Sequence, residues 1–409
     1  MEKISVTDFG PIRHAEIEIK PFCILIGHTS SGKSTVAKLL DLFNSEEFYA
    51  IRPGKDLSIF ISLLKKYDID FDFKEHTCIV YQKDKYTWTI SQEGFETNLS
   101  LETVINKAYD VKSPLVNSYY TPQEVLSLVM KLLKEKNSLQ KLPTPEKSGF
   151  LLDDITLSSE NLISTIRKYL DKVEKTFIYI PAERIFMSAL SRAIFSFYSK
   201  DINLPDCLKA FGNIYSIAKS GQKQYKINFM DLEVDFNTET GDKIQLKTGE
   251  TISLNQASTG LQSIIPLLSV FDFNLKENSC RIIEEPELNL YTQVQKDLTE
   301  YLVKRTKEAK AKLFITTHSP YILSTIQNLL QAGNVAAESP EKAEQVAKLV
   351  SPDKWIDYNE LTCQFFSNDG TSHNILDEEY HTIGINQMDD VSAELSEIYD
   401  SLLDIKYNE

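Results

Sequence analysis

An α/β fold with a parallel sheet is predicted for this sequence by three observations. A glycine-rich loop at residues 27–35 stands between an apolar run of strand character, 21–26, and a run with helical spacing, 36–43. A second apolar run, 280–283, ends in carboxylates. From residue 258 onward, helical segments alternate with short apolar runs. This alternation indicates parallel strands joined by crossover helices.

Length, composition and charge are those of an ordinary globular protein. The 409 residues allow two or three domains, with 42% hydrophobic and 25% charged residues. A net charge of −15 predicts no general attraction to nucleic acid, although a local basic patch could still bind it. Five scattered cysteines without a C-x-x-C pair are typical of reduced thiols. With no signal-peptide pattern or membrane-spanning run, we expect a soluble, cytoplasmic protein without a membrane partner.

The segments before residue 258 predict an antiparallel sheet beside the parallel core. Two alternating strands, 3–7 and 15–20, are joined by a Gly10-Pro11 turn. Further elements are expected in chain order: strands at 69–74, 77–82 and 86–91, helices at 122–136 and 158–175, a strand at 176–180, a helix from 181 to about 199, and short strands within 227–254.

The segments from residue 258 complete the predicted core and add a tail. The expected core elements are helices at 258–271, 291–305 and 320–330 and strands at 280–283 and 312–316. The tail is expected to hold a charged helix at 339–349, strand character at 360–366 and an amphipathic helix at 391–405.

The loop at residues 27–35 matches G-x-x-x-x-G-K-[ST], the phosphate-binding P-loop. Its glycines let backbone N–H groups turn inward, and the following helix adds its positive end. Lys33 would reach the β- and γ-phosphates, and the Ser34 hydroxyl would bind Mg²⁺. The predicted nucleotide-binding residues of the loop are Gly27, His28, Thr29, Ser30, Ser31, Gly32, Lys33, Ser34 and Thr35.

A pair of carboxylates follows the strand at 280–283. In open α/β folds this carboxyl edge of the sheet is where nucleotides bind. Glu284 would hold the Mg²⁺ shell, and Glu285 would polarise the attacking water as general base. The alternative is a solvated acidic turn at a strand end, which is common in proteins.

Two further stretches have a possible role at the same edge. His318, just past the strand at 312–316, could hydrogen-bond a γ-phosphate or a catalytic water, although a lone histidine is more often structural. The small-residue loop with Ser258 and Gly260 opens a helix and could bind an anion. It could equally be an ordinary helix start capped by Ser258.

These motifs, in this order, resemble the ABC-type ATPase heads, a class that includes the SMC, RecF and OLD proteins. The resemblance rests on the P-loop, S-T-G-L-Q, I-I-E-E-P-E and T-T-H-S-P, and covers residues 1–45 and 250–325. It implies an ATP- and Mg²⁺-dependent ATPase whose two heads sandwich ATP. Lys33, Glu285 and His318 would then be catalytic, Glu284 and Ser34 would hold the metal, and Ser258 and Gly260 would touch the γ-phosphate of the partner head. Residues 288–290 fall at the D-loop.

The chain departs from the class pattern in places. His28-Thr29-Ser30 stands where many relatives have Pro-Asn-Gly, and the signature lacks the doubled glycine of transporters. Gln82 is one candidate for the Q-loop. Residues 181–184 resemble an insert of OLD-like ATPases, which implies that Arg184 reaches the nucleotide.

The resemblance predicts a domain division and a fold class. The fold class is α/β: a P-loop NTPase with an ABC-ATPase-like head, an antiparallel β subdomain and a helical insertion. The expected parts are N-terminal strands and P-loop at 1–45, a β-hairpin and helical insertion at 46–175, the remainder of the ATPase head at 176–335, and a C-terminal helical tail at 336–409.

The expected job is that of an ATP-dimerised switch gating a separate effector, such as a nuclease or toxin. This is similar to the ATPase subunits of bacterial anti-phage systems of the PtuA or AriA kind, which are OLD-like ATPases without a Toprim nuclease. Fewer than about a hundred residues follow His318, with no D-x-D. Two alternatives stay open: a RecF-like DNA-binding ATPase in repair, and a nucleotide-binding scaffold that barely hydrolyses. The absence of N-K-x-D favours ATP over GTP.

Overall fold

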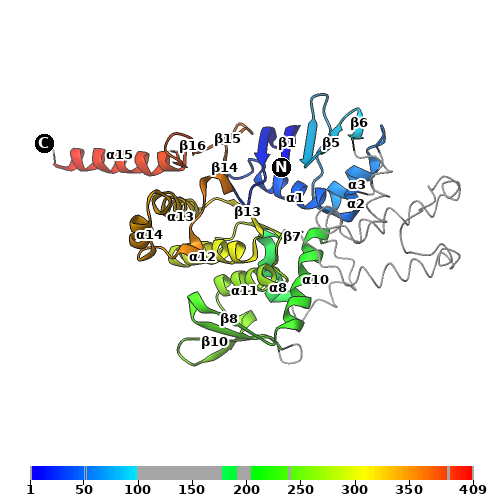
Figure 1. Ribbon diagram of the computed structural model, residues 1–409. Helices are drawn as coiled ribbons and strands as arrows, with labels where there is room; N and C mark the ends of the chain where they lie inside the picture. The colour runs from blue at the N-terminus through cyan, green and yellow to red at the C-terminus, as the bar shows by residue number, and fades with distance from the viewer. Residues whose placement is uncertain are drawn as a thin grey trace.

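A six-stranded sheet forms the centre of the molecule (Figure 1). The computed structural model describes residues 2–49, 51, 53–98, 177–190, 204–237, 241–384 and 387–407. The strand order is β15-β14-β3-β13-β12-β7, with every neighbouring pair parallel except the edge pair β14–β15. The strands are β3 (Phe22–Gly27), β7 (Phe177–Ile180), β12 (Cys280–Glu284), β13 (Lys312–Thr317), β14 (Leu361–Phe366) and β15 (Ser372–Asn374).

Both faces of this central sheet are covered by other elements, which is why its inner strands are buried. All six residues of β3 are buried, as are all five of β12. Alternate residues of β3 enter different cores: Ile24 packs into one cluster and Leu25 into the other. The first cluster includes α11 (Thr259–Asp272), α12 (Thr292–Ala309) and α13 (Pro320–Glu338), and the second includes α1 (Lys33–Phe43).

Two antiparallel sheets flank the core. One has the order β2-β1-β4-β5-β6 and joins the cluster around α1. The other, β11-β10-β9-β8, shares its core with α10 (Asp206–Gly221) and α11. Their strands are β1 (Glu2–Phe9), β2 (Ile12–Glu18), β4 (Cys78–Lys83), β5 (Tyr86–Ser91), β6 (Gly94–Thr97), β8 (Gln224–Ile227), β9 (Leu232–Asp235), β10 (Lys243–Gln245) and β11 (Thr251–Ser253).

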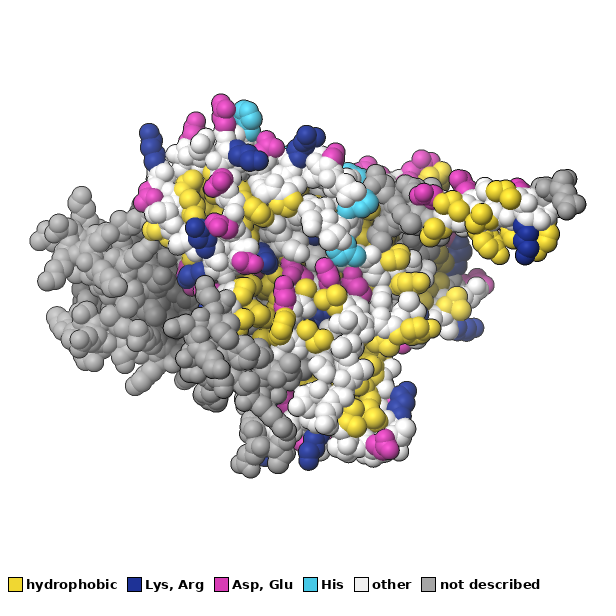
Figure 2. Space-filling model, turned by 180° about the vertical axis from the view of Figure 1, so that it is seen from behind, with side chains coloured by type: hydrophobic (Ala, Val, Ile, Leu, Met, Phe, Trp, Pro, Cys, Tyr) yellow, Lys and Arg dark blue, Asp and Glu magenta, His cyan; other side chains and the backbone are white. Residues whose placement is uncertain are grey.

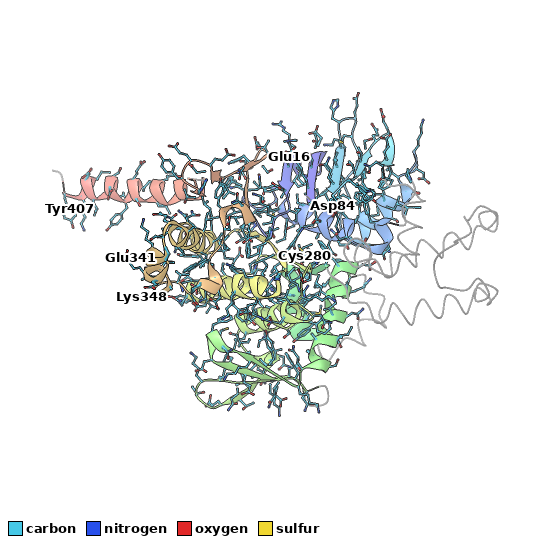
Figure 3. All side chains as sticks on the ribbon, in the orientation of Figure 1. Glu16, Asp84, Cys280, Glu341, Lys348 and Tyr407 are labelled. Atoms are coloured by element: carbon cyan, nitrogen blue, oxygen red, sulfur yellow. The ribbon has the colours of Figure 1, made fainter. Side chains whose placement is uncertain are left out.

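The remaining elements are short or lie outside this core. They are the helices α2 (Glu46–Tyr49), α3 (Ser58–Lys66), α8 (Ile185–Leu190), α14 (Pro340–Ala347) and α15 (Gln387–Tyr407), the strand pair β16 (Leu376–Asp377) and β17 (Thr382–Ile383), and several 3₁₀ turns. Side chains crowd the interior around Cys280 at the start of β12, whereas α15 extends from the body as far as Tyr407 (Figure 3). Within the described part of the chain, no helix has the length and apolar character needed to cross a membrane.

The predicted fold class is confirmed, and one predicted strand is wrong. Residues 69–74 form no strand, because their alternating apolar residues serve a different contact. The Phe71 and Phe73 rings pack on Phe9, with ring centroids 5.5 and 5.4 Å away. The helices expected at 122–136 and 158–175, and the last part of the helix expected to about 199, fall outside the described residues. Residues 182–184 form a 3₁₀ turn before α8.

The segment expected to be a helical tail also supplies β14, which lies beside the P-loop strand. Residues 361–366 of β14 pair in parallel with residues 22–27 of β3. At the end of this ladder the Phe366 carbonyl accepts a hydrogen bond from the His28 N–H at 3.1 Å. A residue more than 300 positions along the chain therefore helps to hold the P-loop. The domain division itself stays a prediction.

Candidate nucleotide-binding site

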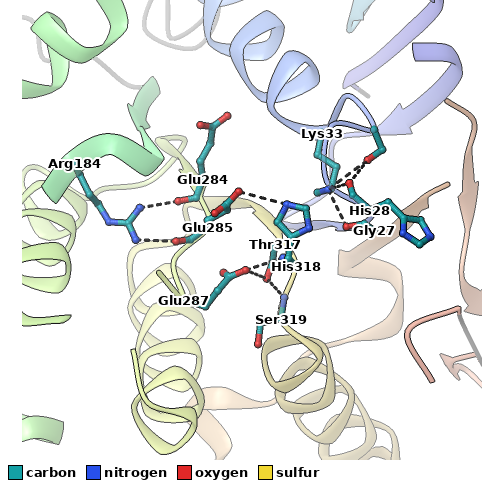
Figure 4. Close-up of polar contacts among 11 residues, drawn as sticks. Gly27, His28, Lys33, Arg184, Glu284, Glu285, Glu287, Thr317, His318 and Ser319 are labelled. Atoms are coloured by element: carbon teal, nitrogen blue, oxygen red, sulfur yellow. Dashed lines mark hydrogen bonds and ion pairs between the residues drawn. The ribbon is translucent and has the colours of Figure 1, made fainter. Parts of the chain in front are cut away.

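The sequence motifs meet at the carboxyl ends of three neighbouring strands. Parallel registers align Thr317 of β13 with Ile26 of β3, and Glu284 of β12 with Thr316 of β13. The P-loop, the acidic turn and the histidine loop therefore leave the sheet at the same edge, where open α/β folds bind ligands. Figure 4 shows the side chains of these three loops facing one another.

The P-loop depends on glycines at both ends. Gly27 has φ 142° and Gly32 has φ 103°, in the region that favours glycine. A Cβ at Gly27 would lie 2.2 Å from the Phe366 carbonyl oxygen, and one at Gly32 would lie 2.3 Å from Ile12. Gly32 is the N-cap of α1 and supplies no side-chain hydrogen bond to the first N–H groups of that helix, which have no partner within the helix. This loop can hold phosphate oxygens.

The Lys33 side chain is buried and folded back on its own loop. Its Nζ donates to the carbonyls of Gly27 at 3.0 Å and His28 at 2.6 Å, and lies 3.4 Å from the Ser31 hydroxyl. Burial lowers the pKa of Lys33 to about 8, although the carboxylates of Glu285 and its neighbours favour the charged form. A buried ammonium in a ring of oxygen acceptors is prepared for the oxygens of a phosphate.

Glu284 is the buried carboxylate of the pair. Burial raises its pKa to about 7, while the nearby Tyr179 and Ser34 hydroxyls act in the opposite direction. Its Oε1 is buried without a hydrogen-bond partner, which is costly unless something else binds there.

A carboxylate and a hydroxyl suit Mg²⁺, which prefers oxygen ligands and commonly takes one or two protein groups together with substrate phosphates. The donor set of Glu284 and Ser34 therefore fits this ion. Among the described residues, no group of three or more histidine, cysteine or acidic side chains could hold a metal by itself.

Glu285 follows Glu284 in the chain, but its environment is different. Its backbone takes the left-handed conformation, φ 41°, and its N–H donates to the Thr316 carbonyl at 2.8 Å. This turn directs its carboxylate toward His318, whose Nε2 lies 3.4 Å from Oε1. The His318 contact lowers the pKa of Glu285. A half-exposed, charged carboxylate is the form that can accept a proton from water.

Glu287 anchors the histidine loop, a role that the sequence analysis missed. Its Oε1 accepts hydrogen bonds from the Thr317 hydroxyl and the His318 N–H, both at 2.7 Å. The Ser319 hydroxyl caps α13 and donates to the Gln295 side chain at 2.6 Å. These contacts fix the backbone that carries His318. The sequence signal for this role was Glu287 itself, the third glutamate of the motif E-E-P-E.

Arg184 holds the acidic turn, and its contact with a nucleotide stays a prediction. Its guanidinium is fully buried, and it donates to the carbonyls of Glu284 at 2.7 Å and Glu285 at 2.8 Å. Burial lowers its pKa to about 10, which leaves it charged at neutral pH. It is a positioning residue for the two carboxylates. Gln82, the Q-loop candidate, is exposed on β4.

The loop with Ser258 and Gly260 lies at the surface, at the start of α11. The Ser258 hydroxyl caps the helix, accepting from the Leu261 N–H at 3.4 Å, so the capping interpretation is confirmed. A Cβ at Gly260 would lie 2.8 Å from the Asn289 carbonyl oxygen. Because Gly260 has no side chain, the loop that carries Ser258 and Gly260 can contact the expected D-loop at residues 288–290. Contact with a nucleotide on a partner head stays a prediction.

Comparisons with known proteins bear on this geometry. The family model described as "AAA ATPase domain" matches residues 1–323. Similar solved structures include an SMC head domain from Thermotoga maritima, with 11% identity, 79% of this chain and 90% of that chain covered, and a TM-score of 0.34. Another is a Pyrococcus furiosus Smc head bound to the C-terminal domain of ScpA, with 10% identity, coverages of 98% and 100%, and a TM-score of 0.35.

A comparison with curated proteins finds no match. The family model, by contrast, covers most of the chain and includes the P-loop, the acidic turn and His318. The chain therefore belongs to the AAA ATPase domain family.

Proposed function

We propose that this protein binds ATP with Mg²⁺ at the carboxyl edge of the central sheet and hydrolyses it to ADP and phosphate. The observation that carries the proposal is the Glu285 side chain. It is charged, half-exposed and in contact with His318, and it follows directly after a buried carboxylate suited to a cation. A solvated acidic turn would not require one of two adjacent glutamates to be buried and the other to be exposed beside a histidine.

In this proposal each side chain has a separate role. Lys33 exchanges its loop carbonyls for β- and γ-phosphate oxygens and neutralises their charge. Ser34 and Glu284 would hold the Mg²⁺, which would supply further neutralisation of the transferring phosphoryl group. Glu285 accepts a proton from the attacking water, and His318 positions that carboxylate and contacts the γ-phosphate.

We further infer that two copies close around ATP, with Ser258 and Gly260 of one copy completing the site of the other. The exposure of the Ser258 loop and its contact with the Asn289 segment support this arrangement. A helix N-terminus with exposed N–H groups is suited to an anion held by a second molecule.

The closing of the pair would act as a switch read by a separate effector, such as a nuclease or toxin in bacterial anti-phage defence. This part of the proposal rests on the motif resemblance to OLD-like ATPase subunits. The alternative is a RecF-like ATPase that binds DNA across the pair. The net charge of −15 is unfavourable for a DNA-binding surface.

ATP turnover of the purified chain, with and without duplex DNA, tests these functions, and Glu285→Gln is the control variant. The switch proposal expects slow turnover that DNA does not change and that the variant lacks. Stimulation by DNA that falls with rising salt would favour the RecF-like alternative. Turnover equal in wild type and variant would contradict the proposed ATPase and favour a nucleotide-binding scaffold.

A further inference from the structure

The helix α15 exposes a stripe of large apolar side chains. Leu395, Ile398, Leu402 and Ile405 are 62%, 49%, 57% and 77% exposed. Figure 1 shows α15 projecting from the body of the molecule, and Figure 2 shows hydrophobic side chains gathered along it. Large apolar side chains that share one exposed face mark an interaction site.

The spacing of this stripe is that of a coiled-coil seam. The four residues follow one another at intervals of three, four and three positions, so Leu395 and Leu402 occupy heptad position a, and Ile398 and Ile405 occupy position d. In the sequence, Val391 and Met388 continue the same a/d register. A helix that packs on a globular core normally has a wider stripe, whereas most large apolar residues of this helix fall at a and d, with Tyr399, Leu403 and Tyr407 outside those positions.

The residues that flank the seam place no like-charge barrier between copies of this helix. Positions e and g decide which helices can pair, because their side chains meet across the interface. Here they are Glu394 and Ser401 at g, and Tyr399 and Lys406 at e. A single acid and a single base leave the flanks close to neutral.

The other acids of α15 lie away from the seam, and in the sequence Asp389 and Asp390 fall at positions b and c. Glu397 and Asp404 occupy position c, and Asp400 occupies position f, so they stay in solvent when the seam is covered. A basic partner helix would form ion pairs with acidic side chains at positions e and g. Among the flanking residues named above, Glu394 is the only acid. The charge pattern therefore favours another copy of α15 over a basic partner.

We propose that α15 is an assembly helix, which pairs with α15 of other copies of this chain without any nucleotide. Leucine at a and isoleucine at d favour more than two strands when the helices run parallel, so a four-chain bundle is expected in that orientation. The proposal stands apart from the ATP-dependent closing of heads. If both hold, the tethered heads would meet at a high effective concentration, and ATP would only need to close them.

The test is the solution mass of the full chain, measured by light scattering after gel filtration without nucleotide. Leu402→Asp puts a charge in the seam, whereas Leu403→Asp makes the same change one residue on, at position b outside it. Both changes have the same effect on helix propensity. We expect wild type and Leu403→Asp to have a multiple of the 46.7 kDa chain mass, and Leu402→Asp to have a lower mass.

Three results would overturn the proposal. One is a wild-type protein that has the mass of a single chain at every concentration. Another is an equal loss of mass in both leucine variants, which would show damage to the helix instead of the seam. The third is a single-chain protein that floats with anionic lipid vesicles unless Leu402 is replaced, which would make α15 a membrane-surface helix. Lys33→Ala separates this proposal from the nucleotide site, because it should leave the nucleotide-free mass unchanged.

Discussion

The sheet edge and α15 depart from the usual distribution of polar and apolar groups in opposite ways. At the edge, Lys33, Glu284 and Arg184 are polar and nearly or fully buried. On α15, Leu395 and Ile405 are apolar and exposed. Polar groups inside and clustered apolar groups outside are the two unusual observations in a folded protein. Each region is incomplete without a partner.

The difference indicates what kind of partner each region needs. The buried Glu284 oxygen without a hydrogen-bond partner is a single atom in a confined place, which suits a small, charged ligand. The stripe on α15 extends over several helical turns and is flanked by few charges, which suits another helix. Changes at one region should therefore leave the other intact.

The largest effect is expected from Lys33→Ala. Removal of one preorganised donor to a developing charge lowers kcat by about 100- to 1,000-fold. Steady-state ATP turnover gives the value, and light scattering shows whether the assembly through α15 persists. Lys304→Ala, which removes surface ion pairs with Asp353 and Glu308, is the control and should keep full activity. Turnover within a few fold of wild type would contradict the role of Lys33.

The next largest effect is expected on folding, from Gly27→Ala. The new methyl group would meet the Phe366 carbonyl in a backbone conformation that L-residues avoid. We expect the free energy of unfolding to fall by about 2–3 kcal/mol. Gly221→Ala is the matched control, because it ends α10 with nothing within 4 Å of the added atom, and it should not destabilise the protein. Equal effects in urea unfolding would show that β14 does not constrain the P-loop.

Glu287→Ala should lower kcat by about tenfold, because the Thr317 hydroxyl and the His318 N–H lose their shared acceptor. Glu287→Gln keeps an acceptor oxygen and should retain most of the activity. Steady-state measurement of kcat and KM for ATP in both variants tests this prediction. If both variants lose activity equally, charge at this position matters, and anchoring of the His318 loop is not its role.

Glu284→Gln should change stability only at pH values above about 4.5. Because burial raises the folded pKa of Glu284 to about 7, above its ordinary value of 4.5, the folded protein holds the proton more tightly than the unfolded chain. Stability is therefore lost as pH rises from about 4.5 to 7, and the variant avoids that loss. We expect it to be more stable than wild type at pH 8, with little difference between the two proteins at pH 4.5. An identical difference at both pH values would contradict the assignment.

Most of the parallel core was predictable, because local patterns determine it. The strand at 280–283, the P-loop and the histidine loop each have a short signature, and parallel strands bring their ends to one edge. Glu287 and Arg184 were harder to predict, because their contacts are with backbone and side-chain groups of distant segments. The partner of β3 was not predictable either, since pairing of Leu361–Phe366 with Phe22–Gly27 spans most of the chain.

The strand expected at 69–74 shows a different limit. Alternation of apolar residues predicts one buried face, but it does not distinguish a strand from an extended segment packed on aromatic rings. The Phe9 ring provides that contact for Phe71 and Phe73. The stripe on α15 is the converse case, because its register is visible in the sequence, whereas its exposure is visible only in the structure.

The most direct test of the nucleotide site is the identity of the nucleotide that each protein holds after incubation with ATP and Mg²⁺ and rapid gel filtration. We predict that Glu285→Gln retains unhydrolysed ATP, because Lys33, Ser34 and Glu284 still bind it, and that wild type retains ADP or has released it. If Glu285→Gln instead converts ATP to ADP at the wild-type rate, the assignment of Glu285 as general base is wrong.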